Sequence, residues 1–323
     1  MNFKNGRVLI VTKSNDSTAD FVLDRMRLRG FSPIRLNSDE FGKQKTTLQF
    51  DNKYISVITQ TAEETIDTYS LSSIWLRRIT SPLMPEVEGD EARRLAEQEN
   101  KLTLKWMLAS AHCRLIDPET KMTEAGNKFL QLQTAPFFGF KIPRTMITND
   151  PEEALKFVQK YPKAIIKTLG GYGKKYMSSF EVTFTQLVTP EIIDQFHLIK
   201  YAPVCLQELV EKNADLRITV VGQQIFSCRI DSQSQESTRF DSRRFDVKTK
   251  YDIWSISTEA KNNILRFMKH FEINFASFDF ALNSKNEVIF FEMNPNSQFV
   301  FVEEATGLPI TDALIDFLVK NGD

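Results

Sequence analysis

The sequence FFEMNPN at residues 290–296, together with FDF at residues 278–280, is the strongest indication of how this chain folds and what it binds. Each motif belongs to an apolar segment typical of a buried strand, and alternation along a strand places Glu292 and Asn294 on the same face. Asp279 can reach that face from an adjacent antiparallel strand. Because Mg²⁺ prefers hard oxygen ligands, the two motifs predict a magnesium site. A polar strand end followed by a proline turn is the alternative interpretation.

A lysine and a glycine-rich loop end another predicted strand, in IIKTLGGYG at residues 165–173. Glycines let backbone N–H groups approach an anion closely, and Lys167 would supply a point charge to phosphate oxygens. The segment is neither a P-loop nor a dinucleotide fingerprint, since GxxxxGK[ST] and GxGxxG are both missing. It predicts a phosphate contact, with an ordinary hairpin as the alternative.

Acidic residues and arginines lie between these two motifs. QELVE at residues 207–211 could hold an adenine through its backbone and a ribose through a carboxylate. Arg217 and Arg229 fall in two successive predicted strands, where they could face one cleft and stabilise a developing acyl phosphate. Surface ion pairing is the alternative for these arginines.

The order of predicted elements divides the 323 residues into three units. Residues 1–117 form an α/β domain with a βαβ start, a hairpin across Asp51, a buried strand at 73–76 and a helix at 86–112. Residues 118–200 form a small unit with helices near 121–135 and 151–160. Residues 201–323 contain the remaining strands, at 204–209, 215–221, 224–231, 275–282 and 287–293, and helices at 258–270 and 310–320. Asp117-Pro118 marks the first boundary, because the residue before proline avoids helical geometry.

Composition excludes several classes of protein. The net charge of −1 provides no field that would attract nucleic acid, and no apolar run approaches the ~20 residues of a membrane helix. The three cysteines are widely spaced, which argues against a disulfide framework and a structural zinc. The N-terminal apolar segment reads as a strand rather than a signal peptide, so we expect a cytoplasmic protein.

The motifs occur in an order that resembles the ATP-grasp enzymes: Asn127-Lys128, IIKTLGGYG, LQELVE, DLRITVVG and FEMNPN. This resemblance covers about residues 120–323. The whole chain is similar to the peptide maturases that make graspetides, the microviridin-type side-chain-crosslinked peptides, through residues 8–41, SIWLRR at 73–78 and the length. It implies an α/β chain, α+β in its C-terminal part, with an ATP-grasp fold preceded by a Rossmann-like pre-ATP-grasp domain.

The resemblance also implies a role for each site residue, with ATP and Mg²⁺ as cofactors. The ATP site would comprise the lysines Lys128 and Lys167, the phosphate loop with Gly170, Gly171 and Gly173, the adenine segment Glu208, Leu209 and Val210, and Glu211 and Asp215 near the ribose. The metal ligands would be Asp279, Glu292 and Asn294, the catalytic arginines Arg217 and Arg229, and the substrate-binding arginines Arg77, Arg78, Arg243 and Arg244. A solvated charge cluster is the alternative for Arg243 and Arg244, and plain ion pairing for Arg77 and Arg78.

The implied activity is an ADP-forming ligation that activates Asp or Glu side chains of a ribosomal precursor peptide. Hydroxyl or amine side chains of the same peptide would then close ester or amide rings. The implied partners are the leader and acidic core of that precursor and, in a homodimer, a second copy of the chain. An ATP-grasp ligase for a small amino acid or a peptide terminus, and a nucleotide-binding module without ligase activity, are the alternative hypotheses.

Overall fold

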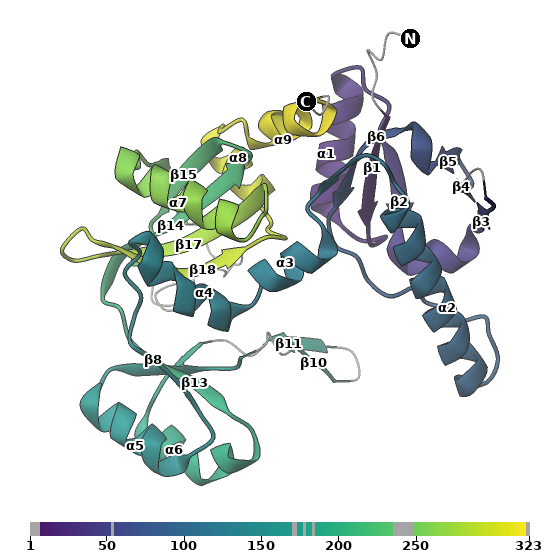
Figure 1. The fold of residues 1–323 in the computed structure, drawn as a ribbon. Coiled ribbons are helices and arrows are strands. Elements are labelled where there is room, and N and C mark those ends of the chain that lie inside the picture. The colour runs from purple at the N-terminus through teal and green to yellow at the C-terminus, as the bar shows by residue number, and fades with distance from the viewer. Residues whose placement is uncertain are drawn as a thin grey trace.

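The structure of the chain is a computed structural model that describes residues 7–52, 55–169, 173–176, 179–182, 185–234 and 249–320. Within 173–176 and 179–182 it describes the backbone alone. Figure 1 shows an N-terminal domain around β1, a C-terminal body around β14 and β17, and a middle unit around β8 and β13. Within the described ranges, no helix is both long and apolar enough to cross a membrane.

The N-terminal domain is built on a parallel sheet in the order β2-β1-β6-β7. Its strand β1, RVLIVT, is almost entirely buried, as expected for a parallel strand covered on both faces. Asp16 caps α1 by accepting hydrogen bonds from the N–H groups of Thr18 and Ala19. The predicted βαβ start and hairpin are therefore confirmed. The elements are β1 (Arg7–Thr12), α1 (Ser17–Leu28), β2 (Ile34–Asn37), η1 (Ser38–Lys43), the antiparallel strands β3 (Lys45–Phe50), β4 (Ile55–Gln60) and β5 (Thr65–Asp67), η2 (Thr68–Ser70), β6 (Leu71–Leu76), α2 (Asp90–Ala109) and β7 (Arg114–Ile116).

Two short helices, α3 (Glu119–Ala125) and α4 (Lys128–Thr134), replace the single helix predicted near 121–135. Asn127 divides them, because its side chain accepts hydrogen bonds from the N–H groups of Phe129 and Leu130 and so starts a new helix. The sequence placed this segment in the middle unit. In the structure α4 packs against β18 (Val288–Asn294) of the C-terminal body, since that strand supplies its apolar partners.

The middle unit has its own sheet, in the order β12-β9-β13-β8, and its own apolar core. The strand at 204–208 was predicted in the third unit, but its hydrogen bonds join it to β8 and β9 in this sheet. The core includes Phe157, Phe196 and Leu206. η3 (Ala135–Phe138) precedes this unit and packs in the C-terminal core, where Ala135 is buried. The elements of the unit are β8 (Thr145–Thr148), α5 (Pro151–Lys160), β9 (Ala164–Lys167), the hairpin β10 (Gly173–Tyr176) and β11 (Ser179–Val182), β12 (Gln186–Leu187), α6 (Pro190–Ile193), η4 (Phe196–Tyr201) and β13 (Val204–Glu208).

The C-terminal body is an antiparallel sheet in the order β16-β15-β14-β17-β18, with helix α7 on one face. Phenylalanine fills the contact between them: Phe267 of α7 lies against the rings of Phe278 and Phe290. Such aromatic pairs add to the free energy gained from burial alone. The elements are β14 (Lys212–Val221), β15 (Gln224–Ile230), β16 (Tyr251–Ile253), α7 (Thr258–His270), β17 (Phe275–Asn283), β18, α8 (Val300–Thr306) and α9 (Ile310–Val319).

The other face of this sheet shares one continuous core with the N-terminal domain. Ile10 and Trp75 from the first domain, Phe275 from β17 and Leu314 from α9 are buried in the same cluster. Figure 1 shows α9 beside α1, and Arg25 of α1 pairs with Asp312 of α9 at 2.9 Å. The first and last parts of the chain are therefore packed together.

Candidate functional site

The motifs that predicted a metal site lie on the neighbouring antiparallel strands β17 and β18. Asp279 is opposite Glu292, and Ser277 is opposite Asn294. Because directly opposed residues of an antiparallel pair share a face, Asp279, Glu292 and Asn294 project from the same side of the sheet. Phe278 and Phe280 point to the other side, into the α7 core. The predicted alternation is present.

A β-bulge at Phe291 allows this arrangement. The register shifts so that Asp279 opposes Glu292 while Phe280 opposes Phe290, which leaves Phe291 as the extra residue. Phe290 and Met293 both lie in the α7 core although they are three residues apart, which strict alternation would forbid. The bulge therefore lets β18 bury both side chains and still present Glu292 on the opposite face.

A cation contacts each candidate carboxylate. Nη1 of Arg217, on β14, donates to Oδ1 of Asp279 at 2.7 Å, and Nζ of Lys128 lies 2.7 Å from Oε2 of Glu292. Burial raises the pKa of Asp279, and the negative charge of Glu292 acts in the same direction, whereas the Arg217 guanidinium opposes both. The side chains of Asp279 and Glu292 keep 33% and 23% of their surface exposed, which leaves both accessible to a ligand.

Gln131 holds the strand segment between the two β18 ligand candidates. This side chain is 1% exposed, its Nε2 donates to the Met293 carbonyl at 2.7 Å, and its Oε1 accepts from the Met293 N–H at 2.8 Å. The clamp fixes the backbone on either side of Met293, where Glu292 and Asn294 project. Sequence reasoning missed Gln131, because a glutamine in a short helix gives no local signal of such a contact.

The predicted phosphate-binding lysine lies in the middle unit. Lys167 ends β9, and its Nζ donates to Oε1 of Gln207 on β13 at 3.1 Å. Cys205 is opposite Lys167 in the β13–β9 pair. Burial raises the pKa of the Cys205 thiol, and the charges of Lys167 and Lys128 oppose that shift. Gly170 and Gly171 of the predicted phosphate loop lie outside the described residues, and Gly173 opens β10.

The predicted adenine segment, Glu208 to Val210, and Glu211, predicted near the ribose, connect β13 to β14. The Leu209 N–H donates to the Lys163 carbonyl at 2.7 Å, and the Glu208 carboxylate accepts from the Arg144 N–H at 2.9 Å. Glu208, Leu209 and Val210 are all partly exposed. Glu211 lies 2.6 Å from the Lys163 ammonium. The segment therefore crosses from the middle sheet to the C-terminal sheet in a partly open position.

Asp215, predicted near a ribose, is 7% exposed and is engaged within the chain. Both of its carboxylate oxygens accept hydrogen bonds from Nζ of Lys212 at 2.7 Å. The sequence did not predict this pairing, because residues three positions apart on a regular strand lie on opposite faces. The irregular register of β14 after Lys212 brings the two side chains together. A ribose contact by Asp215 would compete with Lys212.

The expectation that Arg217 and Arg229 face one cleft is wrong. Arg217 is opposite Cys228 in the β14–β15 register, so the next residue, Arg229, lies on the other face of the sheet. Arg229 instead has Asp252 of β16 as its charged neighbour, with 4.0 Å between Nη1 and Oδ2. Alternation within one strand could not reveal this, because the relative face depends on the register between two strands.

The four arginines predicted to bind substrate divide into two groups. Arg243 and Arg244 lie outside the described residues. Arg77 and Arg78 follow β6, where Arg78 is partly exposed and Arg77 is entirely buried. Nη1 of Arg77 contacts Asn296, in the turn that follows Asn294. Arg77 thus reaches the metal-ligand candidates from the N-terminal domain.

The group of Asp279, Glu292 and Asn294 suits a hard divalent cation. The set offers two carboxylates and one amide on one face of the β17–β18 pair. Mg²⁺ is commonly held by one or two carboxylates, with substrate phosphates completing the coordination. The donor chemistry therefore fits Mg²⁺ together with a nucleotide.

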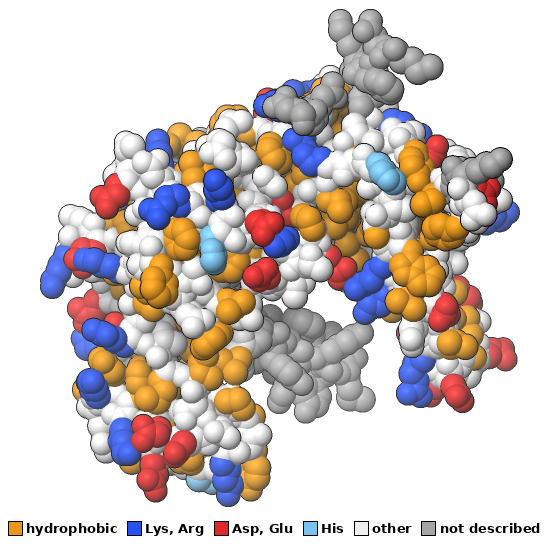
Figure 2. Space-filling model, viewed as in Figure 1, with side chains coloured by type: hydrophobic (Ala, Val, Ile, Leu, Met, Phe, Trp, Pro, Cys, Tyr) orange, Lys and Arg blue, Asp and Glu red, His pale blue; other side chains and the backbone are white. Residues whose placement is uncertain are grey.

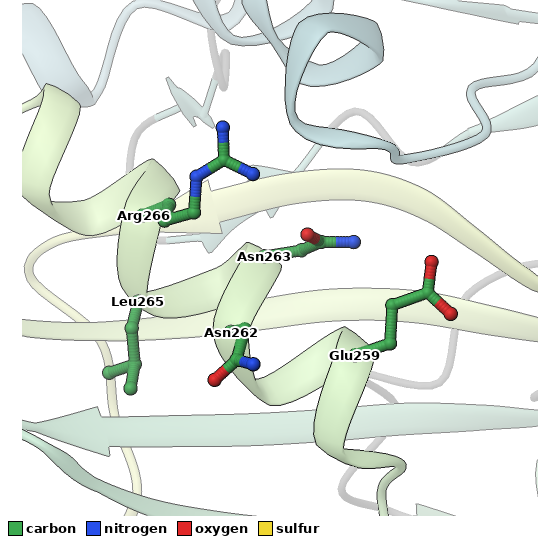
Figure 3. A pocket seen from close by; sticks show the side chains of 5 residues that line it. All are labelled: Glu259, Asn262, Asn263, Leu265 and Arg266. Carbon is green, nitrogen blue, oxygen red and sulfur yellow. The ribbon is translucent and has the colours of Figure 1, made fainter.

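Figure 2, viewed as in Figure 1 with α7 in front of the C-terminal sheet, shows an indentation in the outline of the molecule between the middle unit and the N-terminal domain. A separate depression runs along α7, lined by Glu259, Asn262, Asn263, Leu265 and Arg266. Figure 3 shows Glu259, Asn263 and Arg266 pointing to one side of that helix and Leu265 to the other. Because α7 covers the phenylalanine face, this depression lies across the sheet from Asp279 and is distinct from the candidate site.

Comparison with known proteins identifies the family of the chain. Residues 7–123 match the family described as the MvdD pre-ATP grasp domain, and residues 125–318 match the RimK-like ATP-grasp domain. A probable alpha-L-glutamate ligase of Shewanella denitrificans is 24% identical over 210 residues, which is 64% of this chain and 67% of that protein. The chain therefore belongs to the RimK-like ATP-grasp family, and its enzyme class is that of the ATP-grasp ligases.

Two solved structures are similar to this chain over its whole length. A RiPP-associated ATP-grasp ligase of Chryseobacterium gregarium, in complex with ADP and a leader and core peptide, has a TM-score of 0.91 and 26% identity over 98% of both chains. The macrocyclase MdnC of Microcystis aeruginosa, bound with precursor peptide MdnA, has a TM-score of 0.86 and 28% identity, over 97% of this chain and 99% of that one. The predicted fold, an ATP-grasp domain preceded by a pre-ATP-grasp domain, is confirmed.

Proposed function

We propose that this chain is an ADP-forming peptide ligase that activates Asp or Glu side chains of a ribosomal precursor peptide. It then joins each activated side chain to a Ser or Thr hydroxyl or a Lys amine of the same peptide, giving ester or amide rings. The observation that carries this proposal is the likeness, over 98% of both chains, to a ligase bound to a leader and core peptide. The glutamate ligase from Shewanella aligns with only 64% of the chain.

The proposed reaction has two steps, phosphorylation of the carboxylate and displacement of the phosphate. An oxygen of the substrate carboxylate attacks the γ-phosphorus of ATP, the bond to the bridging oxygen breaks, and ADP leaves. The hydroxyl oxygen or amine nitrogen then attacks the acyl carbon, phosphate leaves, and the attacking group loses its proton. The first step mainly requires positioning and charge neutralisation, which lysines, arginines and carboxylates can supply without a protein nucleophile.

The side chains of the candidate site divide this work. Lys167 would contact the nucleotide from the middle unit, and Lys128, whose side chain is 55% exposed, would contact it from the start of α4. Asp279, Glu292 and Asn294 would hold Mg²⁺, which neutralises phosphate charge when bound. Arg217, 2.7 Å from Asp279, favours the charged form of that carboxylate against the effect of burial and adds positive charge beside the reacting groups. Arg229, on the other face of the sheet, has no part in this step.

Intact mass spectrometry tests the proposal. The chain is incubated with ATP, Mg²⁺ and a small acidic peptide that contains Thr or Lys and is encoded next to it. Each ring should lower the peptide mass by about 18 Da, one water, because condensation proceeds through an acyl phosphate. Later treatment with hydroxide separates esters, which open, from amides, which persist.

A ligase for free amino acids or peptide termini is the second candidate, and the 24% identity to a glutamate ligase favours it. In the same experiment that enzyme would add the mass of an amino acid less one water. Its ATP hydrolysis would rise with a free amino acid instead of with the peptide. An unchanged peptide together with amino-acid-stimulated turnover would replace the peptide-ligase proposal.

A further inference from the structure

The turn at residues 295–298, which follows β18, is held from two sides by arginines, of which Arg77 is fully buried and Arg217 is 11% exposed. Nη2 of Arg217 donates to Oγ of Ser297 at 2.7 Å and to the Gln298 carbonyl at 2.9 Å. From the N-terminal domain, Nη1 of Arg77 donates to both the backbone carbonyl and Oδ1 of Asn296, each at 2.6 Å. The turn therefore joins the two bodies at the candidate site.

Within the turn, Asn296 is linked directly to a metal-ligand candidate. Its backbone N–H donates to Oδ1 of Asn294 at 2.9 Å. That contact fixes the orientation of the Asn294 amide, and it depends on where the Asn296 backbone is held. A contact that fixes the position of the Asn296 backbone therefore also fixes the position of Oδ1 of Asn294.

Arg77 is itself rigidly placed. It directly follows β6, and its N–H donates to the Val11 carbonyl of β1 at 2.9 Å. Its Nε lies 3.7 Å from Oδ2 of Asp16, and that carboxylate is held by the α1 cap and by Oγ1 of Thr12 at 2.7 Å. Neither end of the Asp16–Arg77–Asn296 connection therefore depends on a mobile surface side chain.

The position of this connection is that of a ligand site in related architectures. In the parallel sheet β2-β1-β6-β7, the chain adds β2 on one side of β1 and then β6 and β7 on the other side. Open α/β sheets bind ligands at such a switch point, outside the carboxyl ends of the strands. Asp16 follows β1 and Arg77 follows β6. Here Asn296 of the C-terminal body contacts Arg77 at that place.

The energetics indicate that Arg77 does more than fill space. Its side chain is 0% exposed, burial lowers its pKa to about 10, and among the described residues its Nε and Nη2 have no hydrogen-bond partner. Burying unsatisfied guanidinium nitrogens is unfavourable, and apolar side chains often replace buried ion pairs without loss of stability. Packing alone therefore does not account for an arginine here, and its two hydrogen bonds to Asn296 are the contacts through which it can act on the turn.

We propose that Arg77 is a positioning residue for the metal-ligand turn. Through Asn296 it orients the side chain of Asn294, so that the N-terminal domain, besides any role in substrate binding, completes the geometry of the metal site. The proposal rests on the proposed function in so far as the metal is the Mg²⁺ of the ATP reaction. Outer contacts of this kind typically change metal affinity by about 10- to 100-fold.

The test measures metal binding apart from turnover. Binding of Mn²⁺, used as a paramagnetic probe in the presence of ADP, is titrated by electron paramagnetic resonance for wild type, Arg77→Met, Arg77→Lys and Asn296→Ala. We expect Arg77→Met and Asn296→Ala to weaken Mn²⁺ binding by about 10-fold and Arg77→Lys to recover part of the loss. Asn296→Ala carries the test if Arg77→Met does not fold.

Arg114→Met is the matched control. Arg114 also joins the N-terminal domain to the C-terminal segment, by donating to the carbonyls of Phe317 and Lys320, but at the end of α9 away from the turn. It should lower the thermal unfolding midpoint and leave Mn²⁺ affinity unchanged. Wild-type affinity in both Arg77→Met and Asn296→Ala, or equal weakening in Arg114→Met, would overturn the proposal. Failure of the peptide to lose water, with metal binding sensitive to Arg77, would reject the peptide-ligase function alone.

Discussion

The N-terminal domain and the middle unit join the C-terminal sheet in different ways. The N-terminal domain shares a continuous apolar core with that sheet, and hydrogen bonds from Arg77, Ser73 and Arg114 reinforce the junction. The middle unit instead closes its own core around Phe157 and Leu206. Its two connections to the sheet are the segments at 139–144 and 209–211, and the Lys141 carbonyl accepts from the Phe290 N–H at 2.7 Å.

This difference divides the candidate site between a fixed and a separately folded part. Asp279, Glu292 and Arg217 stand on the sheet that is fused to the N-terminal domain, whereas Lys167 stands on the middle unit. A nucleotide that contacts both groups must bridge two bodies. Variants in the fused part should therefore impair the chemical step, and those in the middle unit should chiefly affect nucleotide binding.

The largest effect is expected for Glu292→Gln in the fused part. This change keeps the size of the side chain but removes its negative charge and replaces one acceptor oxygen by an N–H donor group. Its partner Lys128 is 55% exposed, so the fold should persist. We expect ATP-dependent turnover to fall by about 1000-fold, similar to the loss of a principal charge-stabilising group. Steady-state assays of ADP release measure the effect, and circular dichroism checks the fold.

Asp279→Asn should give a comparable loss of turnover, but it also leaves Arg217 without its carboxylate. That guanidinium is only 11% exposed, so this variant should be less stable than Glu292→Gln. Near wild-type turnover in both variants would remove the metal assignment. Full loss in only one would assign the metal to that carboxylate alone.

The sequence predicted the features of the site that depend on local patterns and missed those that depend on long-range pairing. Alternation along β18 and the pairing with β17 were predictable, because both are local patterns, and they brought Asp279, Glu292 and Asn294 to one face. The bulge at Phe291, the opposite face of Arg229 and the membership of β13 in the middle sheet depend on register and on which strands pair. Those are long-range properties that no window of sequence contains.

The positioning contacts were beyond sequence reasoning for a related reason. Gln131 and Arg77 act through partners 162 and 219 residues away. Gln131 is of a residue type that is common on exposed helix faces. Arg77 in SIWLRR suggests a substrate contact, because two arginines at the end of a strand could bind an acidic ligand. Only the packing of the C-terminal turn against the N-terminal sheet shows that Arg77 is buried.

Two matched leucines test whether the two junctions differ in stability. Leu314 lies in the shared core and Leu206 in the middle core, and both are 0% exposed. Each Leu→Ala change should cost about 3 kcal/mol in the free energy of unfolding of its own unit. The three tryptophans, Trp75, Trp106 and Trp254, all lie outside the middle unit, so fluorescence reports on the fused part.

We expect Leu314→Ala to shift the fluorescence transition in urea to a lower concentration. Leu206→Ala should leave that transition in place and shift a separate component seen by circular dichroism. An equal fluorescence shift in Leu206→Ala would mean that the middle unit unfolds together with the rest, and the comparison would fail.

A smaller effect is expected for Lys167→Met in the middle unit. The loss of one charge-assisted hydrogen bond to a phosphate, worth about 1.5–3 kcal/mol, should raise the KM for ATP by about 10- to 100-fold. The change in kcat should be smaller, because Asp279 and Glu292 are untouched. Lys156→Met is the control, since that exposed lysine of the same unit pairs with Glu153 at 2.7 Å on the surface of α5. A fall in kcat with unchanged KM would place Lys167 in the chemical step.

The smallest effect concerns Asp117, at the junction between the fused bodies. Its carboxylate accepts from the Asn274 N–H at 2.9 Å, the Asn274 amide at 2.8 Å and the Phe275 N–H at 3.0 Å. Burial raises the pKa of Asp117, and these three hydrogen bonds only partly oppose that shift. An aspartate whose pKa is higher in the folded chain than in the unfolded chain binds its proton more tightly when folded.

The contribution of Asp117 to stability should thus be complete below the unfolded pKa of about 3.9 and be lost as pH rises through the raised folded value. Urea unfolding followed by tryptophan fluorescence, compared between wild type and Asp117→Asn at each pH, isolates this group from the other carboxylates. Relative to the variant, wild type should lose about 1 kcal/mol for each unit by which the pKa is raised. If wild type instead gains stability relative to the variant as pH rises, the hydrogen bonds from Asn274 and Phe275 outweigh the cost of burial. The ionised Asp117 carboxylate would then stabilise the junction.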